Sequence, residues 1–462
     1  MESNLTDRTY NYVFELEIKL KNISPLRIGT GEDEKILLTE DNKSLIFGSS
    51  ICGAVKSYLM NVHKKEKVEK FFGYTKEEDD GNGGKKEVHI ESKIYFSDMI
   101  SNKDISGKRI ERDGIRVNTN LGSTLDKGKY KSVFIEKGNE YKLRIKVFID
   151  IKEAEGLKDL LKSIVNGINK KQILFGADKT KGFGVFEVTE ANYIEFDLKK
   201  DMESYLKRNI LKKDEMESFD YENRKILDEL GNISFTGDIK DSFLLKGEMK
   251  SETYKDSNGK NKTKKVQYSY EEGENKYIIP SGTIKGSMRA YIEKILNTIE
   301  HNKKEKLITD LFGHKAEEKE QKNYKMGKLI IEDCQITKIK DLEKIEETEY
   351  HRIKIDRFTG GAINGALINE KRLVKGEVNL KFRIRKCLND DEKALILLYL
   401  RDLGLGKIVL GSNGNVGSGR INGKSIEIDG IKIDLNNMDT ISEKSKTEIN
   451  KWFEELKKEV KA

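Results

Sequence analysis

The chain of 462 residues is long enough for two or three domains of ordinary size. Charged residues make up 36% of it, and 87 basic against 80 acidic side chains leave a net charge of +7. This mild basic excess does not by itself prove a nucleic-acid partner. Three cysteines without a CxxC pair exclude a disulfide framework and a zinc site, and they predict buried free thiols. No apolar run is long enough to cross a membrane, so we expect a cytoplasmic protein.

The first half of the chain alternates strand-like and helix-like patterns. Alternating apolar residues predict a strand over Tyr12 to Leu20, and serines ahead of apolar residues at helical spacing predict a helix that begins near Ser50. The features expected in chain order are a strand at 12–20, a turn at 25–31 with an acidic cluster at 32–34, apolar runs at 36–38 and 45–47, a helix from 50, a strand at 93–98, a polar excursion from 112, a strand at 141–149, a helix at 157–168, a glycine loop at 175–185 and a strand at 185–188.

The second half repeats this order. A stretch at 197–230 is charged and helix-prone, which suits a linker. The features expected after it are strands at 233–243, an amphipathic helix at 281–299, a strand at 328–334, a polar excursion at 351–376, a strand at 373–384, a helix at 391–403, a glycine loop at 410–420 and a helical segment at 442–460. The apolar face of this last segment, which includes Trp452, is explained either by packing on its own domain or by docking to a partner.

Two motifs recur at nearly one spacing. Gly176, Gly182 and Gly184 of the first glycine loop each have a counterpart 235 residues later, in Gly411, Gly417 and Gly419. The segment Ser50–Tyr58 matches Thr283–Tyr291 at an offset of 233. The repeat predicts two copies of one α+β domain of ferredoxin-like plan, each with an inserted hairpin, at residues 1–196 and 231–436, joined by a linker at 197–230 and followed by a C-terminal helix at 437–462.

The glycine loops are candidates for holding a phosphate chain. Glycine permits positive φ and lets the backbone approach a ligand, and exposed N–H groups can bind phosphate oxygens. Surface turns are also rich in glycine, so the loops alone do not decide between the two interpretations. Neither loop has the Gly-x-x-x-x-Gly-Lys-Ser spacing of a nucleotide-binding loop, which excludes an NTPase of that class.

The two helix entrances are a second candidate for phosphate binding. Hydroxyls and backbone N–H groups at a helix N-terminus form a ready anion site. In the second copy, Lys285 and Arg289 lie one turn apart on one helix face, where they could grip successive phosphates. Ordinary helix capping beside solvated basic residues is the alternative, and the pairing with a glycine loop in both copies favours phosphate contact.

The polar excursion at 351–376 is too rich in glycine for a core element, and it carries basic residues with one aromatic, Phe358. A projecting hairpin explains this composition, and such a hairpin could wedge between stacked bases.

These segments together resemble the RAMP (repeat-associated mysterious protein) superfamily. The resemblance rests on Ile279–Arg289, Leu311–Gly313, Lys328–Asp333, Ile355–Ala362 and the closing glycine loop, and more weakly on their counterparts in the first copy. The set looks like the backbone subunit of type III CRISPR–Cas effector complexes, and two fused copies look like the tandem backbone proteins of type III-D. Such a resemblance implies an RRM-like core that binds guide RNA (crRNA) and a thumb hairpin that intrudes into the guide–target duplex.

The resemblance also implies which residues contact RNA. Cys52 stands where the family usually has lysine, so we expect the first copy to hold RNA less tightly there. The thumbs fall at about 112–137 and 351–376, with Arg112, Arg116, Arg352, Lys354, Arg357 and Phe358 as their contacts. The other predicted RNA-binding residues are Ser49, Ser50, Lys56, Lys179, Lys181, Gly182, Gly184, Ser281, Thr283, Lys285, Arg289, Asn413, Gly417, Gly419 and Arg420.

The acidic cluster of the first copy is the candidate catalytic site. Members of the family cleave target RNA with an acidic residue in the loop after the first strand and a divalent metal. Asp33 is the first candidate for both catalysis and the metal, followed by Glu34 and then Glu32. A carboxylate there could bind Mg²⁺ and align the attacking 2′-hydroxyl, although an acidic solvated turn is the plain alternative. The corresponding place in the second copy falls near Lys265 in a Lys-rich segment, which predicts binding without cleavage.

The resemblance implies crRNA, target RNA, other RAMP backbone subunits, and the large signature and small subunits of a type III complex as partners. Two alternatives stay open: a structural RNA-binding subunit without nuclease activity, and a stand-alone endoribonuclease that processes CRISPR transcripts. Five scattered histidines and two thumbs argue against the second.

Overall fold

A computed structural model describes residues 10–29, 35–79, 85–117, 124–208, 215–222, 232–255, 257–272, 276–314, 325–340 and 343–460. The chain is a mixed α and β protein that folds as two compact units. Unit 1 comprises residues 1–179 and 183–227, and unit 2 comprises residues 180–182 and 228–462. No helix in the described ranges is long and apolar enough to span a membrane.

Unit 1 is built on an antiparallel sheet whose centre is the predicted first strand. Strand β1 pairs with β10 on one side and with β9 on the other, and β5 pairs with β9. The strands are β1 (Tyr12–Asn22), β2 (Leu45–Ile46), β3 (Tyr74–Asp79), β4 (Lys85–Ile90), β5 (Ile94–Phe96), β6 (Met99–Ser101), β7 (Arg109–Val117), β8 (Thr124–Ile135), β9 (Glu140–Ile149), β10 (Phe186–Asp197) and β11 (Glu217–Ser218). The helices are α1 (Gly48–Val62), α2 (Lys65–Phe72), α3 (Leu157–Asn169) and α4 (Leu198–Lys207).

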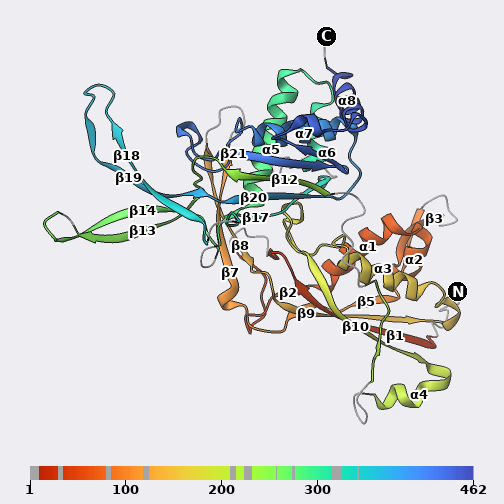
Figure 1. The fold of residues 1–462 in the computed structure, drawn as a ribbon. Coiled ribbons are helices and arrows are strands. Elements are labelled where there is room, and N and C mark those ends of the chain that lie inside the picture. The colour runs from red at the N-terminus through yellow and green to blue at the C-terminus, as the bar shows by residue number, and fades with distance from the viewer. Residues whose placement is uncertain are drawn as a thin grey trace. The chain divides into compact units, whose positions relative to one another are not determined.

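Alternation along β1 decides which face of this sheet is buried. Phe14, Leu16 and Ile18 are fully buried beneath α1 and α3, which pack against one another and against the sheet (Figure 1). The intervening Glu15 and Glu17 form a ladder of ion pairs with basic residues of β9, because successive side chains of a strand point to opposite faces. One face of the sheet therefore holds the core and the other face is charged.

Unit 2 repeats this plan. Strand β12 lies between β20 and β21, and β16 pairs with β20, all antiparallel. The strands are β12 (Asn232–Ile239), β13 (Lys246–Lys255), β14 (Asn261–Ser269), β15 (Ile278–Ile279), β16 (Leu329–Ile331), β17 (Cys334–Gln335), β18 (Glu346–Ile355), β19 (Ala362–Lys375), β20 (Glu377–Ile384), β21 (Ile421–Ile428) and β22 (Ile431–Asp434). The helices are α5 (Ser281–Thr298), α6 (Lys304–Phe312), α7 (Asp390–Gly404) and α8 (Glu443–Lys457).

The C-terminal helix α8 belongs to the core of unit 2. It packs against α7, and its Trp452 is fully buried, with the ammonium of Lys393 5.3 Å from the centre of its ring. This favours the first of the two interpretations, in which the apolar face of the helix packs on its own domain.

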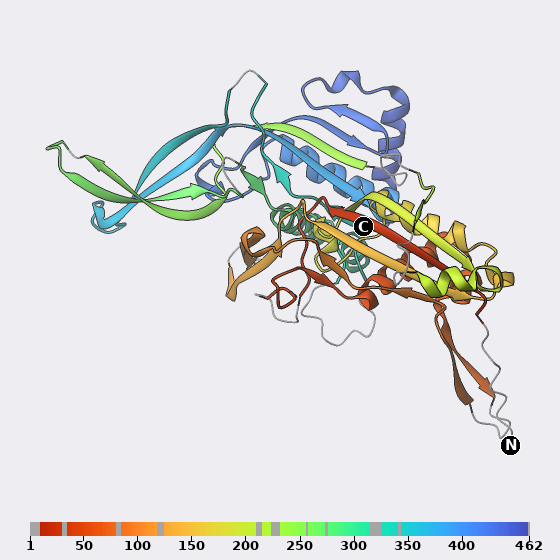
Figure 2. The same cartoon turned by 90° about the horizontal axis from the view of Figure 1, so that it is seen from below.

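Two long hairpins of unit 2 extend away from its helices, as Figures 1 and 2 show. One, β18–β19, was predicted from the polar excursion. The other, β13–β14, was not, because its segment was described only as Lys-rich and no strand was expected there. The two hairpins join in one four-stranded sheet in which β14 runs parallel to β19.

The cysteines only partly follow the prediction of buried thiols. All three are free: Cys334 is buried, which raises the pKa of its thiol to about 12, and Cys52 is half-buried. Cys387 is exposed, so the prediction was wrong for this residue.

Candidate nucleic-acid interface

The glycine loop of unit 2 closes onto the turn that follows its first strand. The N–H of Leu410 donates to the carbonyl of Gly419 at 2.9 Å, and the N–H of Gly419 donates to the carbonyl of Ser242 at 2.7 Å. The N–H of Ser412 donates to the carbonyl of Leu244 at 2.7 Å. These bonds fold the loop back on itself and anchor it to the turn that follows β12.

The glycine loop of unit 1 makes the equivalent bonds. The N–H of Phe175 donates to the carbonyl of Gly184 at 2.9 Å, and the N–H of Gly184 donates to the carbonyl of Pro25 at 2.9 Å. The N–H of Ala177 donates to the carbonyl of Arg27 at 2.7 Å. Loop and turn thus correspond bond for bond in the two copies, so the repeated motif encodes a shared backbone conformation.

The glycines are required because all six have positive φ, between 74° and 86°. A Cβ at Gly184 would lie 1.7 Å from the carbonyl oxygen of Phe175, and one at Gly419 would lie 2.1 Å from that of Leu410. At Gly417, by contrast, a Cβ would meet nothing within 4 Å. The N–H groups of Gly184 and Gly419 donate inside the protein, so the loops serve first to close the fold. Their contact with phosphate remains a prediction.

Each predicted helix entrance holds a carboxylate. Asp98 accepts a hydrogen bond from the N–H of Gly48 at 2.7 Å, and Asp333 accepts one from the N–H of Ser281 at 2.8 Å. A carboxylate at this end interacts favourably with the helix dipole. A phosphate at the predicted contacts Ser49, Ser50, Ser281 and Thr283 would approach this carboxylate, which weakens the electrostatic case for an anion site there.

The basic residues of these helices also correspond. Lys56 Nζ donates to the carbonyl of Gly73 at 2.9 Å, and Arg289 Nη1 donates to that of Gly313 at 3.4 Å. Each glycine ends the following helix, with φ of 69° and 83° respectively. Arg289 Nε also donates to Glu293 at 2.9 Å. Both basic residues therefore tie two helices together, whatever else they bind.

One face of each helix is open to an approaching ligand. Gly53 and Gly286 lie within α1 and α5, both are exposed, and a Cβ on either would meet nothing within 4 Å. A glycine inside a helix destabilises it by about 0.5–1 kcal/mol relative to alanine, and packing inside the protein gives no reason for one here. Cys52 and Lys285 precede these glycines, and both are half-buried. Burial raises the pKa of the Cys52 thiol.

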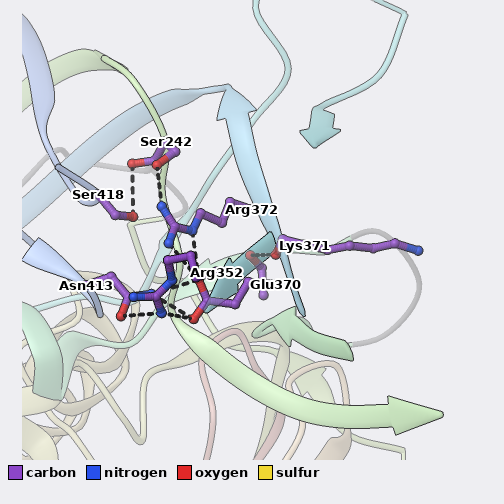
Figure 3. A network of polar contacts seen from close by, with 8 residues as sticks. Ser242, Arg352, Glu370, Lys371, Arg372, Asn413 and Ser418 are labelled. Carbon is purple, nitrogen blue, oxygen red and sulfur yellow. Dashed lines mark hydrogen bonds and ion pairs between the residues drawn. The ribbon is translucent and has the colours of Figure 1, made fainter. Parts of the chain in front are cut away.

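The base of the β18–β19 hairpin is fixed to the glycine loop by the charged network drawn in Figure 3. Glu370, whose side chain is only 1% exposed, pairs with Arg372 at 2.6 Å and with Arg352 at 2.6 Å. Asn413 Nδ2 donates to both carboxylate oxygens of Glu370, at 3.0 and 3.1 Å. Burial on its own raises the pKa of Glu370, but the hydrogen bonds from Arg372, Arg352 and Asn413 outweigh it and hold the pKa below its usual value. The structure thus brings together two predicted residues, Arg352 and Asn413, that are 61 residues apart in the chain.

The tip of this hairpin presents an aromatic side chain to solvent. Asp356 Oδ1 accepts hydrogen bonds from the N–H groups of Phe358 and Thr359, both at 2.9 Å, and these bonds lower the pKa of Asp356. The N–H of Gly360 donates to the carbonyl of Asp356 at 3.0 Å. Phe358 is 99% exposed on this closed turn. Lys354 and Arg357 beside it are exposed as well.

The hairpin of unit 1, β7–β8, is fixed at its base by aromatic contacts instead. Arg112 is buried, with its guanidinium 4.5 Å from the ring centre of Phe134 and 5.7 Å from that of Phe183. Arg116 is exposed and lies 5.7 Å from the ring centre of Tyr130. Arg112 therefore supports the hairpin, as Arg352 does in unit 2. Residues 118–123 at the tip lie outside the described residues.

The remaining predicted contacts lie in the glycine loops. Lys179 and Lys181 bound a short 3₁₀ turn, and the corresponding turn in unit 2 spans Gly414–Val416. Gly182 lies just after the first turn and has positive φ. Arg420 is exposed at the end of the second loop.

The predicted catalytic residues Glu32, Asp33 and Glu34 lie outside the described residues. Elsewhere, in the parts that the structure describes, no group of three or more His, Cys, Asp or Glu side chains is arranged to hold a metal. In unit 2, the place near Lys265 that corresponds to this acidic cluster lies in the strand β14.

Sequence reasoning missed the hairpin β13–β14, and it assigned no role to the two capping aspartates or the two helix-ending glycines, although Asp333 and Gly313 lie in segments that carry the resemblance. The two aspartates could have been recognised from the repeat, because Asp98 and Asp333 are separated by the same 235 residues as the loop glycines.

Taken together, these features define a duplicated α+β protein in which a glycine loop and a projecting hairpin recur in both copies. A model of the RAMP superfamily matches residues 19–187 and 247–422, which is more than half of the chain. The chain therefore belongs to the RAMP superfamily.

Other comparisons add little. No curated protein matches the chain. One similar solved structure is a chain from a cryo-EM structure of the type III-B Cmr-beta complex bound to cognate target RNA. It is 14% identical, with a TM-score of 0.29, and the match covers 40% of this chain and 61% of that one. A similarity of this size, over less than two thirds of the other chain, assigns no function.

Proposed function

We propose that the protein is a guide-RNA-binding backbone subunit of a type III CRISPR RNA-targeting complex, with a type III-D-like fusion of two backbone domains. Membership of the RAMP superfamily over both copies supports the assignment to this class. The observation that carries it is the β18–β19 hairpin, whose tip exposes 99% of Phe358 while its base is fixed to the glycine loop through Glu370. A firmly held hairpin with a solvent-exposed aromatic tip is suited to stacking on bases.

We also propose that each unit is a ferredoxin-like, RRM-like domain. The strand order β10–β1–β9–β5 in unit 1 and β21–β12–β20–β16 in unit 2, with two helices packed on one face, supports this assignment. The outward glycines Gly53 and Gly286 mark the helix face where an RNA backbone could approach closely.

The direct test is RNA binding by the purified full chain. Fluorescence anisotropy with a labelled oligouridine, followed across a salt series, measures affinity and the number of phosphate contacts. We expect binding that weakens steeply as salt rises. Absence of binding by the intact chain at low salt would refute the proposal.

Target cleavage is the finer part of the proposal. We propose that Asp33, with Glu34 and Glu32 beside it, holds Mg²⁺ and makes unit 1 an endoribonuclease site within the complex, in the cytoplasm. The bound metal would supply charge stabilisation at the scissile phosphate. The proposed partners are crRNA, target RNA, other backbone subunits, and the large and small subunits of the complex.

Two experiments separate this proposal from the alternatives. If a reconstituted complex that carries Asp33→Ala still cuts target RNA at every position, the catalytic assignment is wrong and a purely structural subunit is favoured. If the isolated chain cuts CRISPR repeat RNA, the stand-alone processing enzyme is favoured instead.

A further inference from the structure

The hairpin β13–β14 of unit 2 has no role in the function proposed above. It connects the first strand of the unit to helix α5, and it projects beside β18–β19 while the tips of the two hairpins diverge (Figure 1). Residues 246–269 contain seven lysines against three acidic residues. Such an excess of positive charge on a projecting element favours a polyanionic partner.

A cluster of charged side chains joins the two hairpins at their base. Glu252 and Lys264 are cross-strand partners in one hairpin, and Glu349 and Lys371 are partners in the other. The shortest ion pairs nevertheless run between the hairpins, from Lys371 to Glu252 at 2.6 Å and from Lys264 to Glu349 at 2.5 Å. Tyr268 accepts a further hydrogen bond from Lys371 at 2.9 Å. We call these five residues the inter-hairpin clamp.

The clamp holds its charges firmly. The hydrogen bond to Glu252 raises the pKa of Lys371, and the one to Glu349 raises the pKa of Lys264. The hydrogen bond from Lys371 lowers the pKa of Glu252. Further along, the N–H₂ of Asn369 donates to the carbonyl of Lys265 at 3.1 Å. Side-chain and backbone contacts therefore fix the angle at which β13–β14 leaves β18–β19.

Beyond the clamp, the same face of the sheet continues toward the tips. Alternate residues of a strand share a face, so Tyr254 and Lys262 follow Glu252 and Lys264 on β13–β14. Tyr254 is 44% exposed, and Lys262 is exposed directly opposite it. An exposed aromatic ring among lysines is the combination that binds single-stranded nucleic acid through stacking and phosphate contact.

We propose that β13–β14 is a second RNA-binding finger, which stacks a base on Tyr254 and contacts the phosphate backbone of the RNA strand through Lys262 on the same face and through Lys255 and Lys260 at the ends of the two strands. The inter-hairpin clamp sets its distance from the thumb. The proposal rests on the RNA-binding function proposed above and adds a separate contact site to it.

The test is a triple variant of the full chain, Lys255→Gln/Lys260→Gln/Lys262→Gln, measured by anisotropy with a fluorescein-labelled oligouridine over a salt series. Each lost phosphate contact lowers the slope of log affinity against log salt by about 0.7 for a single strand, so three lost contacts lower it by about 2. We expect the affinity at moderate salt to fall at least about tenfold.

The matched control removes three exposed lysines of unit 2 that lie outside both hairpins, in Lys294→Gln/Lys432→Gln/Lys444→Gln. Fluorescence of Trp452, the single tryptophan, verifies that both variants are folded. The finger is not an RNA site if the wild type binds RNA but the finger variant and the control variant show the same affinity and the same salt dependence as each other. A protein partner for the finger is then favoured. If the wild type itself does not bind, it is the RNA-binding function that fails.

Discussion

Replacing Glu370 with glutamine tests whether the network of Figure 3 stabilises unit 2. The substitution keeps the size of the side chain but removes its charge, which leaves Arg372, only 4% exposed, without its ionic partner. Removing one partner of a buried ion pair typically costs 3–5 kcal/mol. Glutamine still accepts one hydrogen bond, so the lower end applies, about 3 kcal/mol. The pair with Arg352, which is 32% exposed, adds at most about 1 kcal/mol.

The assay is urea unfolding followed by the fluorescence of Trp452, which is buried in unit 2 and therefore reports on that unit. With an m-value of about 3 kcal/mol per molar urea, the midpoint falls by about 1 M. Glu427→Gln, at an exposed position on β21, is the control and should leave the midpoint unchanged. The double variant Glu370→Leu/Arg372→Met removes both charges, and we expect it to recover most of the loss.

The same network gives a pH dependence. The pKa of Glu370 is lower in the folded protein than in the unfolded chain, so its contribution is fully present above the unfolded value, about 4.3, and is lost as the pH falls through the folded value. The difference in stability between wild type and Glu370→Gln should therefore shrink as the pH is lowered below about 4. A midpoint shift no larger than that of the control, or a difference that does not change with pH, would refute the reasoning.

Four further substitutions test individual positions. Gly286→Ala should raise the stability of unit 2 by about 0.5–1 kcal/mol in the urea assay, because alanine is the better helix former. If RNA approaches that face of the helix, the same substitution should weaken RNA binding in the anisotropy assay. Unchanged binding would contradict a contact between RNA and this helix face. Phe358→Ala should leave the urea midpoint unchanged, because the side chain is 99% exposed, while the anisotropy assay should show a loss of about 1–3 kcal/mol in binding free energy. Gly419→Ala should destabilise unit 2 by more than about 3 kcal/mol, because its Cβ would lie 2.1 Å from the carbonyl oxygen of Leu410. Gly417→Ala should cost only the strain of positive φ, about 1–2 kcal/mol, because its Cβ would meet nothing within 4 Å. Equal urea midpoints for the two variants would contradict this difference.

The repeat in the sequence predicted the parts of the structure that depend on local backbone geometry. A glycine at positive φ cannot be replaced without strain, so the requirement is visible in the sequence itself, as at Gly184 and Gly419. Helical periodicity likewise predicted α5 and α7, because their apolar residues face one core.

Contacts between distant segments were not predictable in this way. Lys371 pairs with Glu252, 119 residues earlier, and nothing in either local sequence indicates the other. Arg112 and Arg352 were predicted as RNA contacts because the resemblance places them in the thumb hairpins. The structure instead places the buried Arg112 beside the ring of Phe183 and pairs the half-buried Arg352 with Glu370, and both partners come from other segments of the chain. The β13–β14 hairpin was missed because lysines and threonines replace the apolar residues by which a strand is recognised.

Three consecutive residues of β19 explain how the thumb of unit 2 can be both long and firmly placed. Glu370 and Arg372 face the glycine loop, whereas Lys371 points away from it, as Figure 3 shows, and joins the inter-hairpin clamp. The hairpin is therefore held on both faces at its base, and the position of Phe358 follows from the body of unit 2. A pre-organised tip loses less conformational entropy when it binds. Breaking either network should thus weaken RNA binding without removing any contact to RNA.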